Sequence, residues 1–202
     1  MLDKDCYMEY NFYATIARMK YIERWALMRN TRAENLSEHS LEVSMIAHAL
    51  CVIGNVRYGK KLNEEKAAMI GIYHDASEII TGDMPTPVKY YNKNIKDAFK
   101  SLEDEANRNL INQLPADLRS YYENVFFKSD EYSYEWKLVK AADKLSAMIK
   151  CMEEEKTGNR EFVKAKEATA NALEKLAREL PEVKDFMEEF LPSFSKTLDE
   201  LN

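Results

Sequence analysis

The stretch IGIYHDASEIITGDMPTP, residues 70–87, places three polar side chains in an otherwise apolar helical pattern. They are His74, Asp75 and Glu78. Residues three or four positions apart share one face of a helix, so His74 and Glu78 lie one above the other with Asp75 beside them. Two solvated carboxylates and a single core histidine would also fit this pattern, and the rest of the chain must decide between that interpretation and a functional site.

Helical periodicity extends over most of the chain. Five glycines and five prolines in 202 residues are few for an all-β or disordered protein. Ser37 and Asn63 stand where helix N-caps are expected, and Gly82 with Pro85 ends the helix that carries the polar patch. Helices are expected at residues 8–24, 38–56, 64–80, 94–113, 116–124, 134–156, 160–180 and 182–191, with a loop at 24–35. The pattern predicts one all-α domain over residues 1–202.

The composition argues against several classes of protein. A formal net charge of −6 is unlike a binder of nucleic acid polymers, which concentrates positive charge. The N-terminus has no basic segment followed by an apolar run, and no apolar run is long enough to suggest a membrane span. Cys6, Cys51 and Cys151 are far apart and odd in number, so they are expected to be reduced thiols. We therefore expect a cytoplasmic protein that contacts no membrane.

Two further residues favour a metal site. His39 lies in SEHSLEVSMIAHAL, and Asp143 lies in the apolar segment WKLVKAADKLSAMIKCM. Asp143 could form an ordinary ion pair with Lys140, but its apolar neighbours suggest that it faces the interior, where an unpaired carboxylate is costly. Two imidazoles and two carboxylates suit a divalent first-row metal with positions left open for water and substrate. His48 lies about half a revolution from His39 and is expected to point away.

The order H…HD…D over about a hundred residues is the signature of the HD-domain phosphohydrolases, which this chain resembles. Over nearly its whole length it resembles one branch of them, the bacterial 5′-deoxynucleotidases of the YfbR type. The resemblance rests on four stretches in the same order and spacing: RWALMRNTRAENLSEHS (24–40), YHDASEIITGDMPTPVKYYN (73–92), LVKAADKLSAMIKCMEE (138–154) and LPSFSKTLDE (191–200). One departure is Ala26, where a proline is expected for the branch.

The resemblance implies a single HD-domain helical bundle spanning residues 1–202 and a homodimer. It implies one divalent metal, with cobalt, manganese or copper supporting activity, held by His39, His74, Asp75 and Asp143. Asp75 and Glu78 would be the catalytic residues, with Glu78 handling a proton. The implied substrates are deoxyribonucleoside 5′-monophosphates, contacted by Arg24, Trp25, His39, Asp83, Met84, Pro85 and Thr86.

Several alternatives stay open. Glu78 could support His74 from behind instead of exchanging a proton, and Trp25 could anchor its loop instead of contacting a sugar. Arg29 and Arg32 are expected to be solvated. At the level of function, the chain could be a phosphodiesterase or triphosphohydrolase of the same superfamily, or a nucleotide-sensing helical module without turnover.

Overall fold

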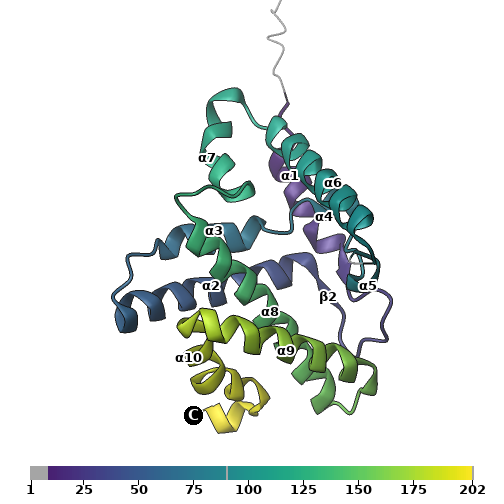
Figure 1. Cartoon of the computed structure of the whole chain (residues 1–202). Helices are drawn as coiled ribbons and strands as arrows, with labels where there is room; N and C mark the ends of the chain where they lie inside the picture. The colour runs from purple at the N-terminus through teal and green to yellow at the C-terminus, as the bar shows by residue number, and fades with distance from the viewer. Residues whose placement is uncertain (1–8, 90, 202) are drawn as a thin grey trace, which may run out of the picture.

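The computed structural model describes residues 9–89 and 91–201, and its ribbon is almost entirely helical (Figure 1). The α-helices are α1 (Phe12–Ile16), α2 (Leu36–Tyr58), α3 (Glu64–Tyr73), α4 (Glu78–Thr81), α5 (Thr86–Lys89), α6 (Lys93–Asn112), α7 (Ala116–Phe126), α8 (Ser133–Lys156), α9 (Val163–Glu179) and α10 (Pro181–Glu189). Short 3₁₀ helices are η1 (Ala17–Tyr21), η2 (Arg160–Phe162), η3 (Leu191–Ser195) and η4 (Leu198–Leu201), and two short strands are β1 (Glu23–Arg24) and β2 (Glu34–Asn35). The expected all-α class is confirmed.

The centre of the bundle is formed by α2, α3 and α8. Figure 1 shows α8 crossing α2, with α9 and α10 on one side and α6 and α7 towards the other end. Leu50 of α2, Ile70 of α3 and Leu145 of α8 are fully buried in one continuous core. By length and composition α2 is apolar enough to cross a membrane, but more than half of its apolar window is buried here. It packs as the central helix of a bundle.

The first turn of α2 is capped by Asn35 and not by Ser37. The Asn35 side chain accepts hydrogen bonds from the backbone N–H groups of Ser37 and Glu38, and the Glu38 carboxylate accepts one from the N–H of Asn35. This capping box satisfies donors that have no partner inside the helix. The predicted Ser37 cap is therefore wrong, and α2 begins two residues earlier than expected.

The predicted helix 64–80 is interrupted. Asn63 caps it as expected, but α3 ends at Tyr73 and α4 begins at Glu78. Between them the N–H of Glu78 donates to the carbonyl of Asp75, only three residues back, which is the bond of a tight turn and not of an α-helix. His74 and Asp75 therefore lie on a turn at the end of α3.

Gly71 lets this turn approach α2 closely. A Cβ atom at position 71 would lie 2.7 Å from the Cα of Ser44, so a residue with a side chain would push the two helices apart. The close crossing places the ring centroids of His39 and His74 5.3 Å apart.

The N-terminal prediction is only partly correct. Residue 8 of the predicted helix 8–24 lies outside the described residues, α1 ends at Ile16, and η1 carries the chain to Tyr21. The other predicted helices agree with the structure to within a few residues, with the start of 160–180 formed by η2.

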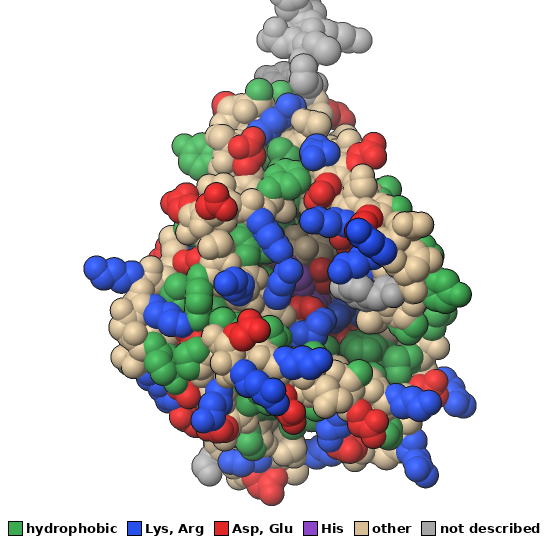
Figure 2. Space-filling view, in the orientation of Figure 1, with side chains coloured by type: hydrophobic (Ala, Val, Ile, Leu, Met, Phe, Trp, Pro, Cys, Tyr) green, Lys and Arg blue, Asp and Glu red, His purple; other side chains and the backbone are tan. Residues whose placement is uncertain are grey.

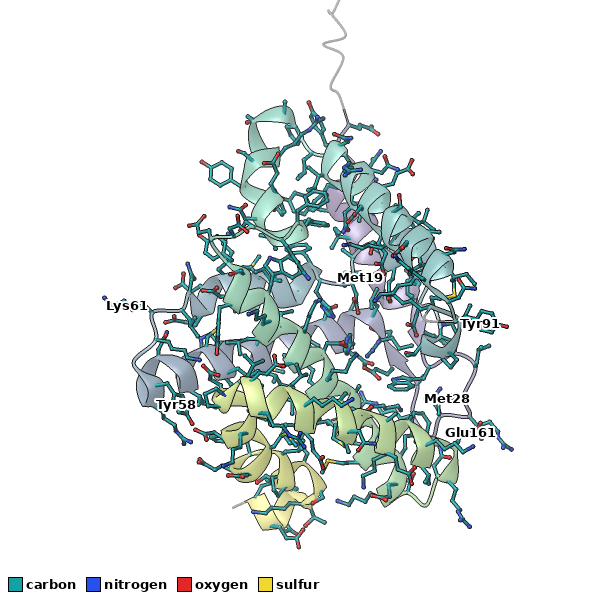
Figure 3. The ribbon with its side chains drawn as sticks, viewed as in Figure 1. Met19, Met28, Tyr58, Lys61, Tyr91 and Glu161 are labelled. Carbon is teal, nitrogen blue, oxygen red and sulfur yellow. The ribbon has the colours of Figure 1, made fainter. Side chains whose placement is uncertain are left out.

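The expected loop at 24–35 contains a small antiparallel sheet. β1 pairs with β2, with Glu23 opposite Asn35 and Arg24 opposite Glu34. The intervening loop leans on η2: Arg29 donates from Nε and NH2 to the Glu161 carboxylate at 3.1 and 2.9 Å, and Figure 3 shows the labelled residues Met28 and Glu161 at this corner. The sheet and this contact hold the loop beside α8.

Candidate metal centre

Three separate segments bring four ligand-type side chains together. His39 projects from the first turn of α2, His74 and Asp75 lie on the turn after α3, and Asp143 lies in the middle of α8. One nitrogen or oxygen atom from each lies within 4.8 Å of the others. The structure thus gathers all four residues that the sequence suggests as metal ligands.

The donor atoms face a common point. His39 Nε2 lies 3.3 Å from Asp143 Oδ1 and 3.6 Å from Asp75 Oδ2, and His74 Nε2 lies 3.0 Å from Asp75 Oδ2. Neither Nε2 has a hydrogen-bond partner among residues 9–89 and 91–201, although both atoms are buried. Leaving such atoms without a partner is costly, and a cation ligated by the group would remove that cost. The mixed nitrogen and carboxylate set fits a divalent first-row metal.

The second ring nitrogen of each histidine is already engaged. His74 Nδ1 lies 2.8 Å from the carbonyl oxygen of Gly71, which can only accept, so Nδ1 carries the proton. His39 Nδ1 lies 2.9 Å from the hydroxyl of Ser146. Histidine ligands commonly hold their second nitrogen in this way. Both rings therefore present Nε2 to the group.

The charges of the group favour a positive charge at its centre. Burial and Arg24 disfavour protonation of His39, but the adjacent carboxylates of Asp143 and Asp75 outweigh them and raise its pKa to about 10. Burial alone would raise the pKa of Asp75, yet His74 and His39 hold it well below its usual value. Buried carboxylates that stay ionised need a cationic partner. A metal ion would provide that charge in place of the imidazole proton.

Glu78 lies beside the group in a different environment. Its side chain is buried, at 5% exposure, and Oε2 has no hydrogen-bond partner in the described part of the chain. Burial and the negative charges of Asp75 and Asp83 raise the pKa of Glu78 to about 9. The Nδ1 of His74 already donates to the backbone carbonyl of Gly71. Glu78 therefore does not support His74 through that nitrogen. Its environment suits a group that exchanges a proton.

Glu34 of β2 holds two of the predicted substrate contacts. Arg24 NH1 donates to Glu34 Oε1 at 2.9 Å, and Trp25 Nε1 donates to Glu34 Oε2 at 3.0 Å. Arg24 NH2 lies 3.9 Å from Asp143 Oδ1, so the guanidinium lies at the edge of the metal group. Glu34 is not among the site residues predicted from the sequence, although it is the single acidic residue in RWALMRNTRAEN.

Trp25 connects this loop with the segment after α4. Its backbone N–H donates to Asp83 Oδ2 at 3.1 Å, and its ring centroid lies 5.4 Å from that of Phe162. Its φ of 57° is uncommon for a residue other than glycine. The rest of the predicted segment lies next to Asp83: Met84 and Pro85 are half-buried, and Thr86 is exposed at the start of α5.

Asp143 of the metal group forms an ion pair with Lys144 at 2.8 Å and not with Lys140, one turn earlier. The remaining candidates lie outside the group. The side chains of Arg29 and Arg32 are 91% and 73% exposed, as expected for solvated residues. His48 is exposed on α2.

The molecular surface is hollowed beside the metal group. Figure 2 shows a hollow near the middle of the face drawn, with acidic and histidine side chains at its floor and lysines and arginines around its rim. The basic rim contrasts with the net charge of −6. A rim of this kind favours a small anionic ligand.

Comparisons with known proteins find relatives of this chain. A model of the family described as 5′-deoxynucleotidase YfbR-like matches residues 11–194. A 5′-deoxynucleotidase of Erwinia tasmaniensis is 48% identical over 192 residues, which cover 95% of this chain and 96% of that protein. These likenesses extend over almost the whole sequence.

Solved structures share the fold. An HD-domain phosphohydrolase from Listeria innocua superposes with a TM-score of 0.79 at 24% identity, covering 91% of this chain and 88% of that one. The cyanophage S-2L HD phosphohydrolase bound to dA and one catalytic Zn²⁺ ion gives a TM-score of 0.59 at 21% identity, covering 91% and 96%. The expected HD-domain helical bundle is confirmed.

Proposed function

The chain belongs to the family of YfbR-like 5′-deoxynucleotidases, and we propose that it works at the centre formed by His39, His74, Asp75 and Asp143. The enzyme is a phosphoric monoester hydrolase that converts a deoxyribonucleoside 5′-monophosphate and water into a deoxynucleoside and phosphate. One observation carries the choice of centre: two buried histidine nitrogens meet two carboxylates and have no hydrogen-bond partner in the described residues.

A divalent cation is the proposed cofactor. When bound, it supplies Lewis acidity, which favours hydroxide near neutral pH and offsets the negative charge on a phosphoryl group. Cobalt, manganese and copper are the ions proposed for activity. Zinc is a further candidate because the cyanophage protein binds it. The identity of the ion follows from the experiment below.

Arg24 is the proposed phosphate contact. Its NH1 is engaged by Glu34, but its buried Nε has no hydrogen-bond partner among the described residues. A guanidinium offers a planar fork of donors that matches phosphate oxygens. Glu34 therefore orients the Arg24 guanidinium and leaves its Nε–H able to donate to the phosphate. Trp25 and the segment Asp83 to Thr86 are proposed to contact the sugar and base.

Glu78 is the proposed acid. Hydrolysis joins a water oxygen to phosphorus and releases the 5′-oxygen of the sugar, which must gain a proton. A buried carboxyl whose pKa lies near 9 carries a proton at neutral pH and can deliver it. Asp75 stays ionised beside it and is proposed to act both as ligand and as the charge that keeps Glu78 protonated.

The centre is tested by removing one histidine and measuring metal and turnover together. Apoenzyme prepared with chelator receives cobalt, manganese, copper or zinc, and phosphate release is followed over a panel of nucleotides. His74→Ala should lose bound metal and activity in parallel, whereas the exposed His48→Ala should keep its metal. Stoichiometric metal and normal turnover in His74→Ala would overturn the ligand set. Preferential hydrolysis of diesters to monophosphates, or of triphosphates to nucleoside and triphosphate, detected by chromatography of the products, would instead support the alternative hydrolase activities.

A homodimer is also proposed, on the basis of the outward face of α2. Four apolar residues project from it at helical spacing: Leu41, Met45, Val52 and Val56 are 58%, 59%, 37% and 78% exposed. A helix that is apolar on nearly every face is usually covered on every face. In an antiparallel copy, Leu41 would meet Val56 and Met45 would meet Val52. The stripe is therefore self-complementary, as a two-fold interface requires.

The dimer proposal is tested by placing a charge on the stripe. Met45→Glu should shift the mass measured by light scattering from dimer to monomer. Tyr121→Glu, at an even more exposed aromatic residue on α7, should not. A wild-type monomer at micromolar concentration would contradict the proposal.

A cytoplasmic location is proposed from the cysteines. Cys51 and Cys151 are buried and free, while Cys6 lies outside the described residues. Buried thiols without disulfides are typical of a reducing compartment. Activity in the cytosolic fraction of lysed cells is the direct check.

A further inference from the structure

The ring of His39 is held from behind by two residues that the proposed reaction does not use. His39 Nδ1 lies 2.9 Å from Ser146 Oγ, and Ser146 Oγ in turn donates to Glu42 Oε2 at 2.5 Å. His39 and Glu42 lie on α2, whereas Ser146 lies on α8. The chain of contacts therefore crosses the interface between α2 and α8.

The direction of these hydrogen bonds is fixed by chemistry. An ionised carboxylate can only accept, so Ser146 gives its single proton to Glu42. Its oxygen is then left to accept from the Nδ1–H of His39. A second acceptor, Glu34 Oε1, lies 3.4 Å from the same nitrogen. Both neighbours keep the proton of His39 on Nδ1, which leaves the Nε2 lone pair for the metal group.

We propose that Ser146 and Glu42 are positioning residues, which hold the His39 imidazole in the tautomer and orientation that bind the catalytic cation. The inference rests on the proposed metal centre. Partners that orient a ligand from behind typically change metal affinity by about 10- to 100-fold when they are removed. Neither residue needs to touch the nucleotide to have this effect.

The surroundings of Ser146 bear on the substitutions that test its role. Ser146 is fully buried, and without its hydroxyl Nδ1 would keep only the longer contact with Glu34 Oε1 at 3.4 Å. A cavity of about 90 Å³ lies alongside, however, lined in part by Glu34, His39 and Glu42. Its lining includes several charged side chains and it has room for a water molecule, which can partly satisfy the ring in Ser146→Ala. We therefore expect that variant to fold.

The first measurement is the zinc affinity of the apoenzyme, by competition with a chelating dye. Ser146→Ala is expected to bind zinc about 10- to 100-fold more weakly. Glu42→Gln keeps an acceptor oxygen but adds a donor, so it should show a smaller loss. Ser40→Ala is the matched control, because Ser40 is also buried on α2 but its hydroxyl has no hydrogen-bond partner among the described residues. It should bind zinc like the wild type.

The second measurement is the NMR signal of the Nδ1 proton of His39 in the zinc-loaded protein. Wild type and Ser40→Ala should show the same exchange-protected resonance, and Ser146→Ala should shift or lose it. A merely structural serine would alter the melting temperature but not this resonance. Should Ser146→Ala fail to fold, Glu42→Gln carries the same comparison.

The outcomes separate this inference from the proposed centre. If Ser146→Ala and Glu42→Gln keep both the zinc affinity and the resonance of wild type, the positioning role is wrong. If His74→Ala also keeps its zinc, the metal centre itself is wrong. Weaker zinc binding and an altered resonance in Ser146→Ala, with an unchanged Ser40→Ala, support the role.

Discussion

Glu78 and Asp75 are neighbours whose pKa values shift in opposite directions. The charge of Asp75 helps to raise the pKa of Glu78 to about 9, whereas the two histidines lower the pKa of Asp75. When the environment separates the pKa values of two adjacent carboxyl groups, one commonly acts as a general acid and the other stays ionised and stabilises charge. In the proposed mechanism, Asp75 would be the ionised ligand and Glu78 the group that supplies a proton.

Glu78→Gln should therefore separate catalysis from ligation. The amide keeps the size of the side chain but cannot release a proton at neutral pH, so kcat should fall by about 10²- to 10⁴-fold. Metal content should stay at the wild-type level. The matched control is Glu135→Gln, which alters an equally buried glutamate that accepts from the backbone N–H of Asn63. Parallel loss of metal and rate in Glu78→Gln would make Glu78 a ligand or a support.

Trp25→Ala tests whether the indole selects the sugar. If the ring packs against C2′, a ribonucleotide must bury its 2′-hydroxyl without a partner, at about 1–3 kcal/mol. The preference for deoxyribonucleotides in kcat/KM should then fall by about 5- to 150-fold. Trp25→Phe keeps a flat apolar ring while losing the bond to Glu34, so it should retain most of the preference.

The competing explanation is visible in the contacts of Trp25 with Phe162 and Glu34. A residue that only anchors the loop would lower kcat/KM in proportion for both sugars and reduce the melting temperature. In that case Asp83 would be the next candidate for the residue that distinguishes deoxyribose from ribose.

Residues such as Glu34 and Ser146 mark the limit of prediction from sequence. The ligand-type residues stand out because histidines and carboxylates are conspicuous within apolar helical segments. Ser146 does not, because its role depends on a hydrogen bond to His39, 107 positions away. Side-chain partners across an interface follow from packing, and periodicity carries no information about them.

The start of α2 gives a prediction at the scale of one element. The Asn35 side chain accepts from two backbone N–H groups of the first turn, so Asn35→Ala should lower the free energy of unfolding by about 0.5–2 kcal/mol. Ser37→Ala, two residues on, should stay within about 0.5 kcal/mol of wild type. Urea unfolding measures the free energies of both variants, provided that the dependence of the free energy on urea concentration is unchanged. A larger loss in Ser37→Ala than in Asn35→Ala would restore the cap that the sequence suggested.

The break between α3 and α4 shows why element boundaries are harder to predict than element type. His74 has nearly helical dihedrals, with φ of −58° and ψ of −32°, and its neighbours keep the apolar spacing of the helix. The pattern therefore continues across a turn whose hydrogen bonds have changed. The close approach of Gly71 to Ser44 just before the turn belongs to the packing of two helices, which local periodicity does not report.

At the scale of the whole molecule, the centre depends on how α2, α3 and α8 cross. No single segment carries more than two of the four ligand-type residues, and His39 and Asp143 meet only because the central helices pack together. The all-α class follows from local periodicity and the scarcity of glycine and proline. The meeting of the ligands depends on tertiary packing, and only the resemblance to a known family anticipates it.

The basic side chains around the hollow should affect how fast the nucleotide is captured. An anionic nucleotide approaches a protein of net charge −6, but the hollow over the centre is rimmed by basic side chains (Figure 2). Lys140 lies one turn before Asp143 on α8, and its proximity, together with burial and Lys100, lowers the pKa of Lys128 to about 8. Several lysines close together concentrate positive potential, and Lys140 stands near the centre because it precedes Asp143 by one helical turn.

Raising the ionic strength from about 0.02 to 0.5 M should therefore lower kcat/KM by up to about tenfold, because the Debye length shrinks to a few ångströms and the rim charges are screened. Lys140→Gln should lower kcat/KM at low salt and flatten this dependence. Lys61→Gln removes the same charge from the loop after α2, well away from the hollow (Figure 3), and should change neither. Steady-state kinetics across the salt series measures all three proteins. If both variants follow the wild-type curve, the rim plays no part in capture, and the centre itself supplies all the attraction for the phosphate.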